Sequence, residues 1–73
     1  MPYPVIDVAA TGRNIGTIIR GSRYSVSDVA DYLGTTTSLV YRYIRGDVLP
    51  STDRLLALSR LLDVTVNDMI LTL

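Results

Sequence analysis

The stretch that decides the fold is SVSDVADYLGTTTSLVYRYIRG, which spans residues 25–46. Ser25 followed by Asp28 has the pattern of a capping box with a shortened acid, and it predicts the start of a helix. Gly34 predicts the end of that helix, because glycine readily adopts the left-handed conformation that reverses the chain in very few residues. The apolar residues between these signals recur at helical spacing and predict a buried face formed by Val26, Val29, Ala30 and Leu33.

Another helix follows at once in the same stretch. Thr36 has the side chain of an N-cap for a helix over residues 37–45, and Gly46 predicts its end. Val40 and Tyr43 lie three positions apart on this helix, so we expect both to pack into the core. The stretch therefore predicts two short helices that flank a tight turn.

The chain beyond this pair predicts two more helices. Ser51 has an N-cap side chain before residues 52–62, which carry the broadest apolar stripe of the protein, at Leu55, Leu56, Leu58, Leu61 and Leu62. Thr65 with Asp68 gives a second box-like start and predicts a terminal helix over residues 66–71. We expect that helix to bury Val66, Met69 and Ile70.

The first twenty residues predict an arm and one helix. Residues 1–6 contain Pro2 and Pro4 and cannot begin a regular helix, so we expect an extended arm whose apolar side chains, Tyr3, Val5 and Ile6, are available to lie on the body. Thr11 can cap a helix over residues 12–20, and a start at Asp7 is the alternative boundary. Gly16 weakens this helix by about 1 kcal/mol relative to alanine, so its stability depends on packing.

Length and composition narrow the class of protein. With 73 residues, 48% of them hydrophobic, the chain predicts a single compact domain with residues 7–73 in one body. The apolar runs are too short for a membrane span and the start lacks a signal-peptide pattern, so we expect a soluble cytoplasmic protein with no membrane partner. Seven arginines balance seven aspartates, and a net charge of zero gives no long-range attraction to nucleic acid.

The same composition argues against an enzyme. Without cysteine or histidine the chain has no disulfide, no zinc finger, no thiol nucleophile and no imidazole base. Asp28 and Asp31, three apart on one turn, could share a metal ion or a proton, but the alternative of a solvated acidic face near a helix N-terminus is preferred. We expect no catalysis, no cofactor, no bound metal and no small-molecule substrate.

The chain uses thirteen of the twenty residue types, and Lys, Glu and Gln are all absent. Because Lys and Glu are among the commonest residues in proteins, this absence suggests an engineered variant with a reduced amino-acid alphabet. A natural protein with biased codon usage is the alternative. If a parent sequence was simplified, residues that once contacted a partner could have been replaced while the core pattern survived.

The stretch from Arg13 to Ile70 resembles the phage-repressor type of helix-turn-helix domain, the lambda-repressor-like or Cro-like family. The resemblance is carried by Ser25, Val29-Ala30, Leu33-Gly34, Thr36, Val40, Tyr43, Arg45-Gly46, Pro50-Ser51, Leu55, Leu61-Leu62, Val64 and Asp68-Met69-Ile70. It implies an all-α, compact bundle of five short helices, in which Ala30 sits where two helices cross closely and Gly34 turns one helix into the next.

The resemblance also implies sequence-specific binding of double-stranded DNA by a repressor-like transcriptional regulator. The helix over residues 37–45 would enter the major groove, with its groove face formed by Thr37, Ser38, Tyr41 and Arg42. Arg42 is the strongest base-reading candidate, because its planar fork can donate two hydrogen bonds to guanine. Arg45 and the Gly46 backbone would lie near phosphate.

Other candidate phosphate contacts, and departures from the family pattern, surround this helix. Possible phosphate contacts are Arg13, Arg20, Arg23 and Ser25, although Asp28 and Asp31 could instead pair with these arginines on a solvated face. Val26 stands where the family often has a glutamine that binds phosphate, so one anchor is absent. Leu39 and Ile44 stand where the family is commonly polar; they could form a dimer contact, fill a gap in the core, or reflect the restricted alphabet.

So few cationic contacts imply weak binding by one copy, and therefore a homodimer on two half-sites. The predicted dimer surface is the end of the chain, at Met69, Ile70, Leu71 and Leu73. Two alternative functions remain open at this point. One is a protein-interaction module with the same fold, and the other is a simplified-alphabet folding design in which DNA binding is weakened or lost.

Overall fold

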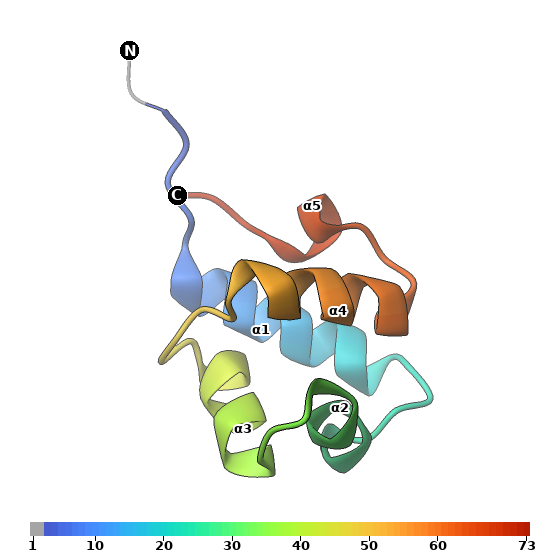
Figure 1. Ribbon diagram of the computed structural model, residues 1–73. Helices are drawn as coiled ribbons and strands as arrows, with labels where there is room; N and C mark the ends of the chain where they lie inside the picture. The colour runs from blue at the N-terminus through green and yellow to red at the C-terminus, as the bar shows by residue number, and fades with distance from the viewer. Residues whose placement is uncertain (1–2) are drawn as a thin grey trace.

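The computed structural model describes residues 3–73 and contains five helices in this range. They are α1 (Val8–Arg20), α2 (Val26–Leu33), α3 (Thr37–Arg45), α4 (Thr52–Leu62) and α5 (Val66–Met69). The prediction of an all-α bundle is confirmed. α3 packs on α1 and α2, while α5 packs on α1 and α4, so the helices enclose one core (Figure 1).

The predicted caps start α2 to α5. In α2 the backbone N–H of Asp28 donates to the Ser25 hydroxyl at 3.1 Å, and the N–H of Ser25 donates to the Asp28 carboxylate at 2.9 Å. Thr36 and Ser51 each accept the backbone N–H three residues later, and Thr65 opens α5 with a second complete capping box. Each cap satisfies a backbone donor that the helix itself leaves unpaired.

The start of α1 differs from the preferred prediction. Asp7 is the N-cap, and its carboxylate accepts the backbone N–H of Ala10 at 3.0 Å. Thr11 is fully buried inside the helix, where its hydroxyl donates to the carbonyl of Leu71 at 3.3 Å and accepts the Leu71 N–H at 2.9 Å. The prediction of Thr11 as a cap is therefore wrong, because its hydroxyl binds the end of the chain, and the alternative start at Asp7 is confirmed.

α5 is one turn long and ends at Met69 rather than at residue 71. Ile70 is already extended, with φ −83° and ψ 127°. The side-chain amide of Asn14 donates to the carbonyls of Asp68 and Met69 at 2.8 and 3.0 Å, which satisfies acceptors at the end of the helix. The helix ends early because α1 supplies the hydrogen-bond partners of this segment: Asn14 binds the carbonyls of Asp68 and Met69, and Thr11 binds the backbone of Leu71.

The core is formed by side chains from all five helices. Its buried members are Ile15, Ile19, Val29, Ala30, Val40, Tyr43, Leu55, Leu58 and Met69. The leucine stripe of α4 is narrower than the sequence predicts, because Leu61 and Leu62 are half-buried and Leu56 is 48% exposed.

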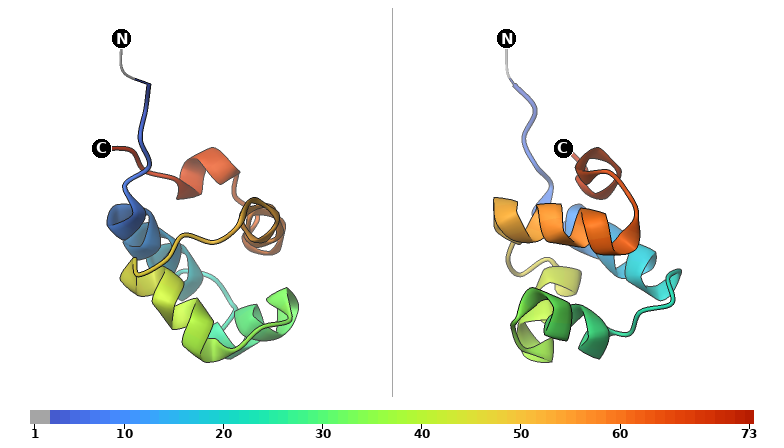
Figure 2. Two further views of the ribbon diagram at one scale, coloured as in Figure 1. Left: turned by 60° about the vertical axis from the view of Figure 1, so that its left-hand side comes forward. Right: turned by 45° about the vertical axis from the view of Figure 1, so that its right-hand side comes forward.

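The described part of the arm, residues 3–6, runs away from the helices beside the C-terminal end of the chain (Figure 2). Ile6 forms an antiparallel β-bridge with Thr72. Tyr3 and Val5 are 82% and 52% exposed, so these two side chains do not lie on the body as the sequence suggested. The part of the predicted arm at residues 1–2 lies outside the described residues.

Candidate nucleic-acid interface

The turn between α2 and α3 sets the direction in which α3 leaves the core. Gly34 has φ +68°, a left-handed conformation that side-chain-bearing residues rarely adopt, and it closes α2 by donating to the carbonyl of Asp31 at 3.2 Å. The next N–H, of Thr35, donates to the carbonyl of Ala30 at 2.9 Å. Ala30 is 2% exposed, as its predicted place at a helix crossing requires. The predicted glycine turn is confirmed.

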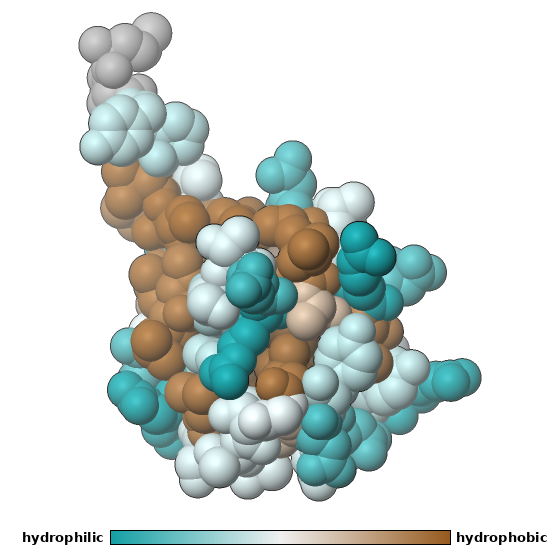
Figure 3. Space-filling model, in the orientation of Figure 1, coloured by the Kyte–Doolittle hydropathy of each residue, from teal (hydrophilic) through white to brown (hydrophobic). Residues whose placement is uncertain are grey.

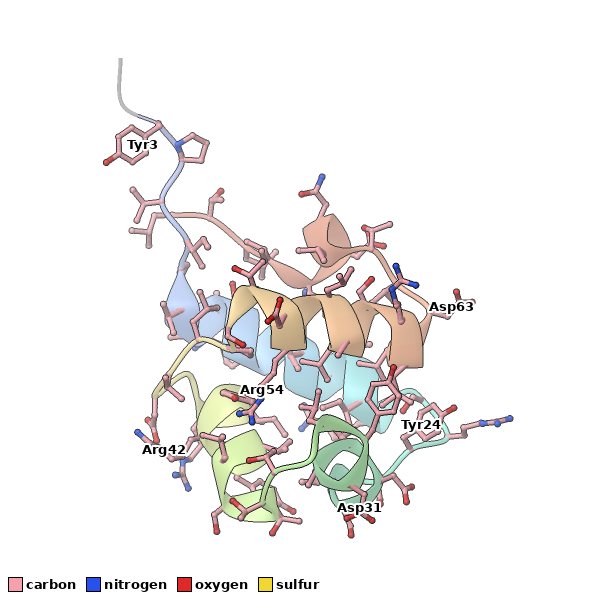
Figure 4. All side chains as sticks on the ribbon, in the orientation of Figure 1. Tyr3, Tyr24, Asp31, Arg42, Arg54 and Asp63 are labelled. Carbon is pink, nitrogen blue, oxygen red and sulfur yellow. The ribbon has the colours of Figure 1, made fainter. Side chains whose placement is uncertain are left out.

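α3 has an inner face and an outer face. Val40 and Tyr43 are buried, at 1% and 4% exposed, as the sequence predicts. The five residues that the sequence nominates for DNA all lie exposed on the outer face, at positions 37, 38, 41, 42 and 45. These positions follow the helical repeat and so share one side of α3. Arg42 points away from the bundle (Figure 4).

Two glycines of α1 let α3 lie close against it. A Cβ atom added to Gly12 would overlap the carbonyl oxygen of Tyr43 and lie 2.8 Å from the nitrogen of Gly46. A Cβ added to Gly16 would lie 2.8 Å from the Cγ2 atom of Ile44. Gly16 therefore does more than weaken the helix, because its missing side chain makes room for Ile44. The close approach fixes the inner face of α3.

Of the two residues at positions where the family is usually polar, Ile44 has apolar surroundings. Ile44 is half-buried and packs against the core in the seam between α1 and α3. Leu39 is also half-buried. The sequence left three explanations open: a dimer contact, the filling of a gap in the core, or the restricted alphabet. The packing of Ile44 supports the second, because its side chain fills space between α1 and α3.

The arginines of α3 differ in their surroundings. The guanidinium group of Arg45 contacts the Asp47 carboxylate at 3.2 Å through both Nη2 and Nε. Both side chains are well exposed, so the pair contributes at most about 1 kcal/mol and can be exchanged for another anion. Within residues 3–73, Arg42 has no ion-pair or hydrogen-bond partner on the protein. Its guanidinium group is available to an external acceptor.

The other nominated arginines are exposed, and within the described chain none pairs with Asp28 or Asp31. Arg23 lies over the ring of Tyr24, with 5.5 Å from its guanidinium carbon to the ring centre. Arg13 and Arg20 lie three and four positions from Gly16 on the side of α1 that faces α3. They therefore flank the seam between the two helices.

The sequence did not single out Arg54, which the structure connects to α3. This residue lies in the first turn of α4 and is half-buried, and its Nη1 donates to the hydroxyl of Tyr43 at 2.8 Å. In Figure 4 its side chain extends from α4 toward α3. The available signal was the tyrosine itself, because a buried phenol hydroxyl needs a partner. Which residue supplies that partner depends on how α4 lies on α3.

The predicted dimer surface is wrong at one residue. Met69 is 0% exposed and belongs to the core, so it cannot contact a second copy. Ile70 is half-buried, while Leu71 and Leu73 are 43% and 85% exposed. The prediction misplaces Met69 because it treats the end of the chain as one helix with an apolar outer side.

Other kinds of site find no support among residues 3–73. No group of three potential metal ligands occurs there. No helix in that range is long and apolar enough to cross a membrane. Asp28 and Asp31 line a shallow surface hollow together with Arg23, Tyr24 and Tyr32, and these two carboxylates are exposed to solvent.

A family model described as helix-turn-helix matches residues 20–69. No curated protein matches the chain at the level of sequence. Among solved structures, the SOS-response transcriptional repressor LexA from Eubacterium rectale is similar with a TM-score of 0.80 and 19% identity, over 88% of this chain and 68% of that chain. The restriction-modification controller protein C.AhdI from Aeromonas hydrophila is similar with a TM-score of 0.77 and 22% identity, over 86% of this chain and 96% of that chain.

Proposed function

This chain belongs to the helix-turn-helix family of the Cro and lambda-repressor type, and on that premise we propose that it binds double-stranded DNA with α3 in the major groove, as a repressor-like regulator. Family membership makes the chain a sequence-specific DNA-binding transcriptional regulator. The role requires access to DNA, which is consistent with the expected cytoplasmic location.

The observation that carries the proposal is the difference between the two faces of α3. Its inner face is buried against α1 and α2, while its outer face has no packing role within the described chain. An α-helix fits the major groove of B-DNA, and a helix fixed on one side and exposed on the other can be inserted without unfolding. The exposed side includes Arg42, whose guanidinium group has no ion-pair or hydrogen-bond partner among residues 3–73.

Arg42 is the proposed base-reading residue. A guanidinium group presents two parallel N–H donors that match the O6 and N7 acceptors of guanine in the major groove. Thr37, Ser38 and Tyr41 share the exposed side and would contact neighbouring bases or thymine methyl groups. The hydroxyl groups of threonine and serine both donate and accept, so we expect them to discriminate less than Arg42.

Phosphate contacts would come from the edges of this surface. Arg45 would exchange its exposed contact with Asp47 for a phosphate oxygen. Arg13 and Arg20 flank the seam beside α3, and Arg23 with Ser25 lies at the entrance to α2. The Ser25 hydroxyl already accepts the N–H of Asp28, which leaves its own proton to donate.

Two copies are part of the proposal. A chain with zero net charge and a handful of arginines near the backbone neutralises few phosphates, so one copy binds weakly. A homodimer on two half-sites doubles the number of contacts. The reduced alphabet stays a prediction; if it reflects a simplified parent, Val26, which has no donor, is a position where a phosphate contact was lost.

The test is selection from a pool of random duplexes at low salt, followed by affinity measurements on the selected site. We expect Arg42→Ala to raise the dissociation constant about 5- to 150-fold and to relax preference at one base pair, because a bidentate contact is worth about 1 to 3 kcal/mol. The matched control is Arg60→Ala, which removes an exposed arginine from α4. Equal affinities for the two variants, or no binding by the unaltered protein, would contradict the proposal. The second outcome would favour an interaction module or a folding design.

A further inference from the structure

The two ends of the described chain pair with each other outside the helical body. The N–H of Asp7 donates to the carbonyl of Leu71 at 2.8 Å, and the N–H of Leu73 donates to the carbonyl of Val5 at 2.9 Å, on either side of the bridge between Ile6 and Thr72. We call residues 3–6 together with 71–73 the terminal ribbon. In Figure 1 it lies at the end of the molecule away from α2 and α3.

In an antiparallel pair of strands the side chains alternate between two faces, which decides which side chains of the terminal ribbon lie together. Residues opposite each other share a face, and residues two apart along an extended strand share it too. This places Tyr3, Val5, Leu71 and Leu73 on one face. Their exposed fractions are 82%, 52%, 43% and 85%, and they are four of the seven large exposed apolar side chains in residues 3–73.

This clustering forms the main exposed apolar patch of the described residues. Single exposed leucines are ordinary, whereas a contiguous apolar patch marks an interaction site. In Figure 3 an apolar area continues from the base of the arm along the same edge of the body. Residues 3–6 and 69–73 contain no charged side chain, and the carboxylate of Asp7, opposite Leu71, is taken up as the cap of α1, so the patch offers little charge complementarity to nucleic acid or to a charged protein. An apolar patch of this kind is complementary to the same patch on a second copy of the chain.

We propose that the apolar face of the terminal ribbon is the contact through which a second copy of this chain binds. Two copies related by a twofold axis would pack Val5 and Leu73 of one against the same residues of the other. The four side chains expose on the order of 500 Å² per copy, which approaches the roughly 800 Å² per partner of a stable interface. The dimer is therefore weak, with dissociation in the micromolar range or above.

The packing is face to face rather than by strand addition. The backbone of residues 4 and 6 turns its hydrogen-bonding side to the outer edge of the ribbon, since residues 5 and 7 make the cross-strand bonds. Pro4 has no N–H, so this edge cannot form a regular ladder with another strand. The arrangement also leaves α3 exposed at the other end of each copy.

This inference names the partner contact that the proposed function requires, but its test needs no DNA. Sedimentation equilibrium of the full chain over a wide concentration range should show a species of twice the 8.0 kDa chain mass. Leu73→Asp should raise the dimer dissociation constant at least tenfold, because it places a charge in the apolar contact. Leu73 is exposed in one copy, so the helical circular dichroism and the melting temperature should not change.

The matched pair is Tyr3→Ser and Tyr32→Ser, which removes an exposed tyrosine from the terminal ribbon or from α2. We expect only Tyr3→Ser to weaken the dimer. A protein that stays monomeric at the highest concentration, or a Leu73→Asp variant that dimerises as well as the unaltered chain, would overturn the inference. So would a monomer that sediments with phosphatidylcholine vesicles, since the patch would then bind lipid.

Binding to a duplex with one half-site separates this inference from the proposed function. A dimer that binds no DNA contradicts the function and leaves the ribbon contact intact. A monomer whose binding to one half-site depends on Arg42 contradicts the ribbon contact and leaves the function intact.

Discussion

At the scale of single residues, Tyr43 connects the core to the recognition surface. Its ring fills the inner side of α3, and its hydroxyl accepts a hydrogen bond from Arg54 at 2.8 Å. The guanidinium group of Arg54 is half-buried, so loss of this acceptor leaves a charged donor without its protein partner. The pair holds the first turn of α4 against α3 and supports the orientation of the outer face.

Tyr43→Phe should therefore lower the free energy of unfolding by about 1 to 2 kcal/mol, since the cavity stays filled and only the hydrogen bond is removed. Tyr41→Phe is the control, because Tyr41 is 49% exposed and should change stability by less than about 0.5 kcal/mol. Urea denaturation of both variants measures the difference. Equal effects would show that the contact between Arg54 and the phenol hydroxyl contributes nothing.

The sequence was informative about which residues face outward and less informative about their partners. Helical spacing placed Val40 and Tyr43 in the core, and the resemblance to the phage-repressor family nominated Arg42 and Arg45, which the structure shows exposed on the other side of α3. The partner of Tyr43 was missed because it comes from another helix, eleven residues along the chain. Such a contact depends on how two elements lie together, which local pattern does not encode.

At the scale of elements, helix ends formed by local caps were predictable and ends formed by distant contacts were not. α2, α3 and α4 begin and end at the predicted residues, because each cap lies within three residues of its acceptor or donor. The start of α1 is also a local cap, at Asp7, but Thr11 offered a rival start, and only its contact with Leu71, 60 residues away, places Thr11 inside the helix. The end of α5 depends on contacts with α1 of the same long range. From its local sequence Thr11 has the pattern of a cap, but in the structure its hydroxyl hydrogen-bonds the backbone of Leu71 near the end of the chain.

The close approach of α1 to α3 gives a prediction about glycines. Gly12→Ala should destabilise the protein by at least about 2 kcal/mol, because the new Cβ meets the backbone of Tyr43 and Gly46, which cannot rotate away. Gly21→Ala is the matched control at the end of the same helix. Its φ is −80° and its added Cβ would sit at ordinary contact distance, so we expect no loss of stability or a small gain.

Thermal or urea unfolding of the two alanine variants makes this comparison directly. If Gly12→Ala were as stable as the unaltered protein, α1 and α3 would have room to separate. The account of how α3 is fixed would then fail.

At the scale of the whole molecule, the zero net charge predicts a modest dependence of DNA affinity on salt. If Arg45 and one arginine of α1 contact phosphate in each copy, the logarithm of affinity should fall with the logarithm of salt with a slope of about −2 for one half-site and about −4 for two. Fluorescence anisotropy between about 50 and 200 mM salt measures both slopes. A slope near zero would mean that binding does not use these arginines.

The central claim is that α3 is the element that meets DNA. The most direct measurement is a titration of the ¹⁵N-labelled protein with its selected duplex, followed by amide chemical shifts along the whole chain. The account predicts that the largest changes fall on residues 37–46 and on the entrance to α2, with little change in α4. Changes centred on the terminal ribbon and α5, with α3 unaffected, would contradict it.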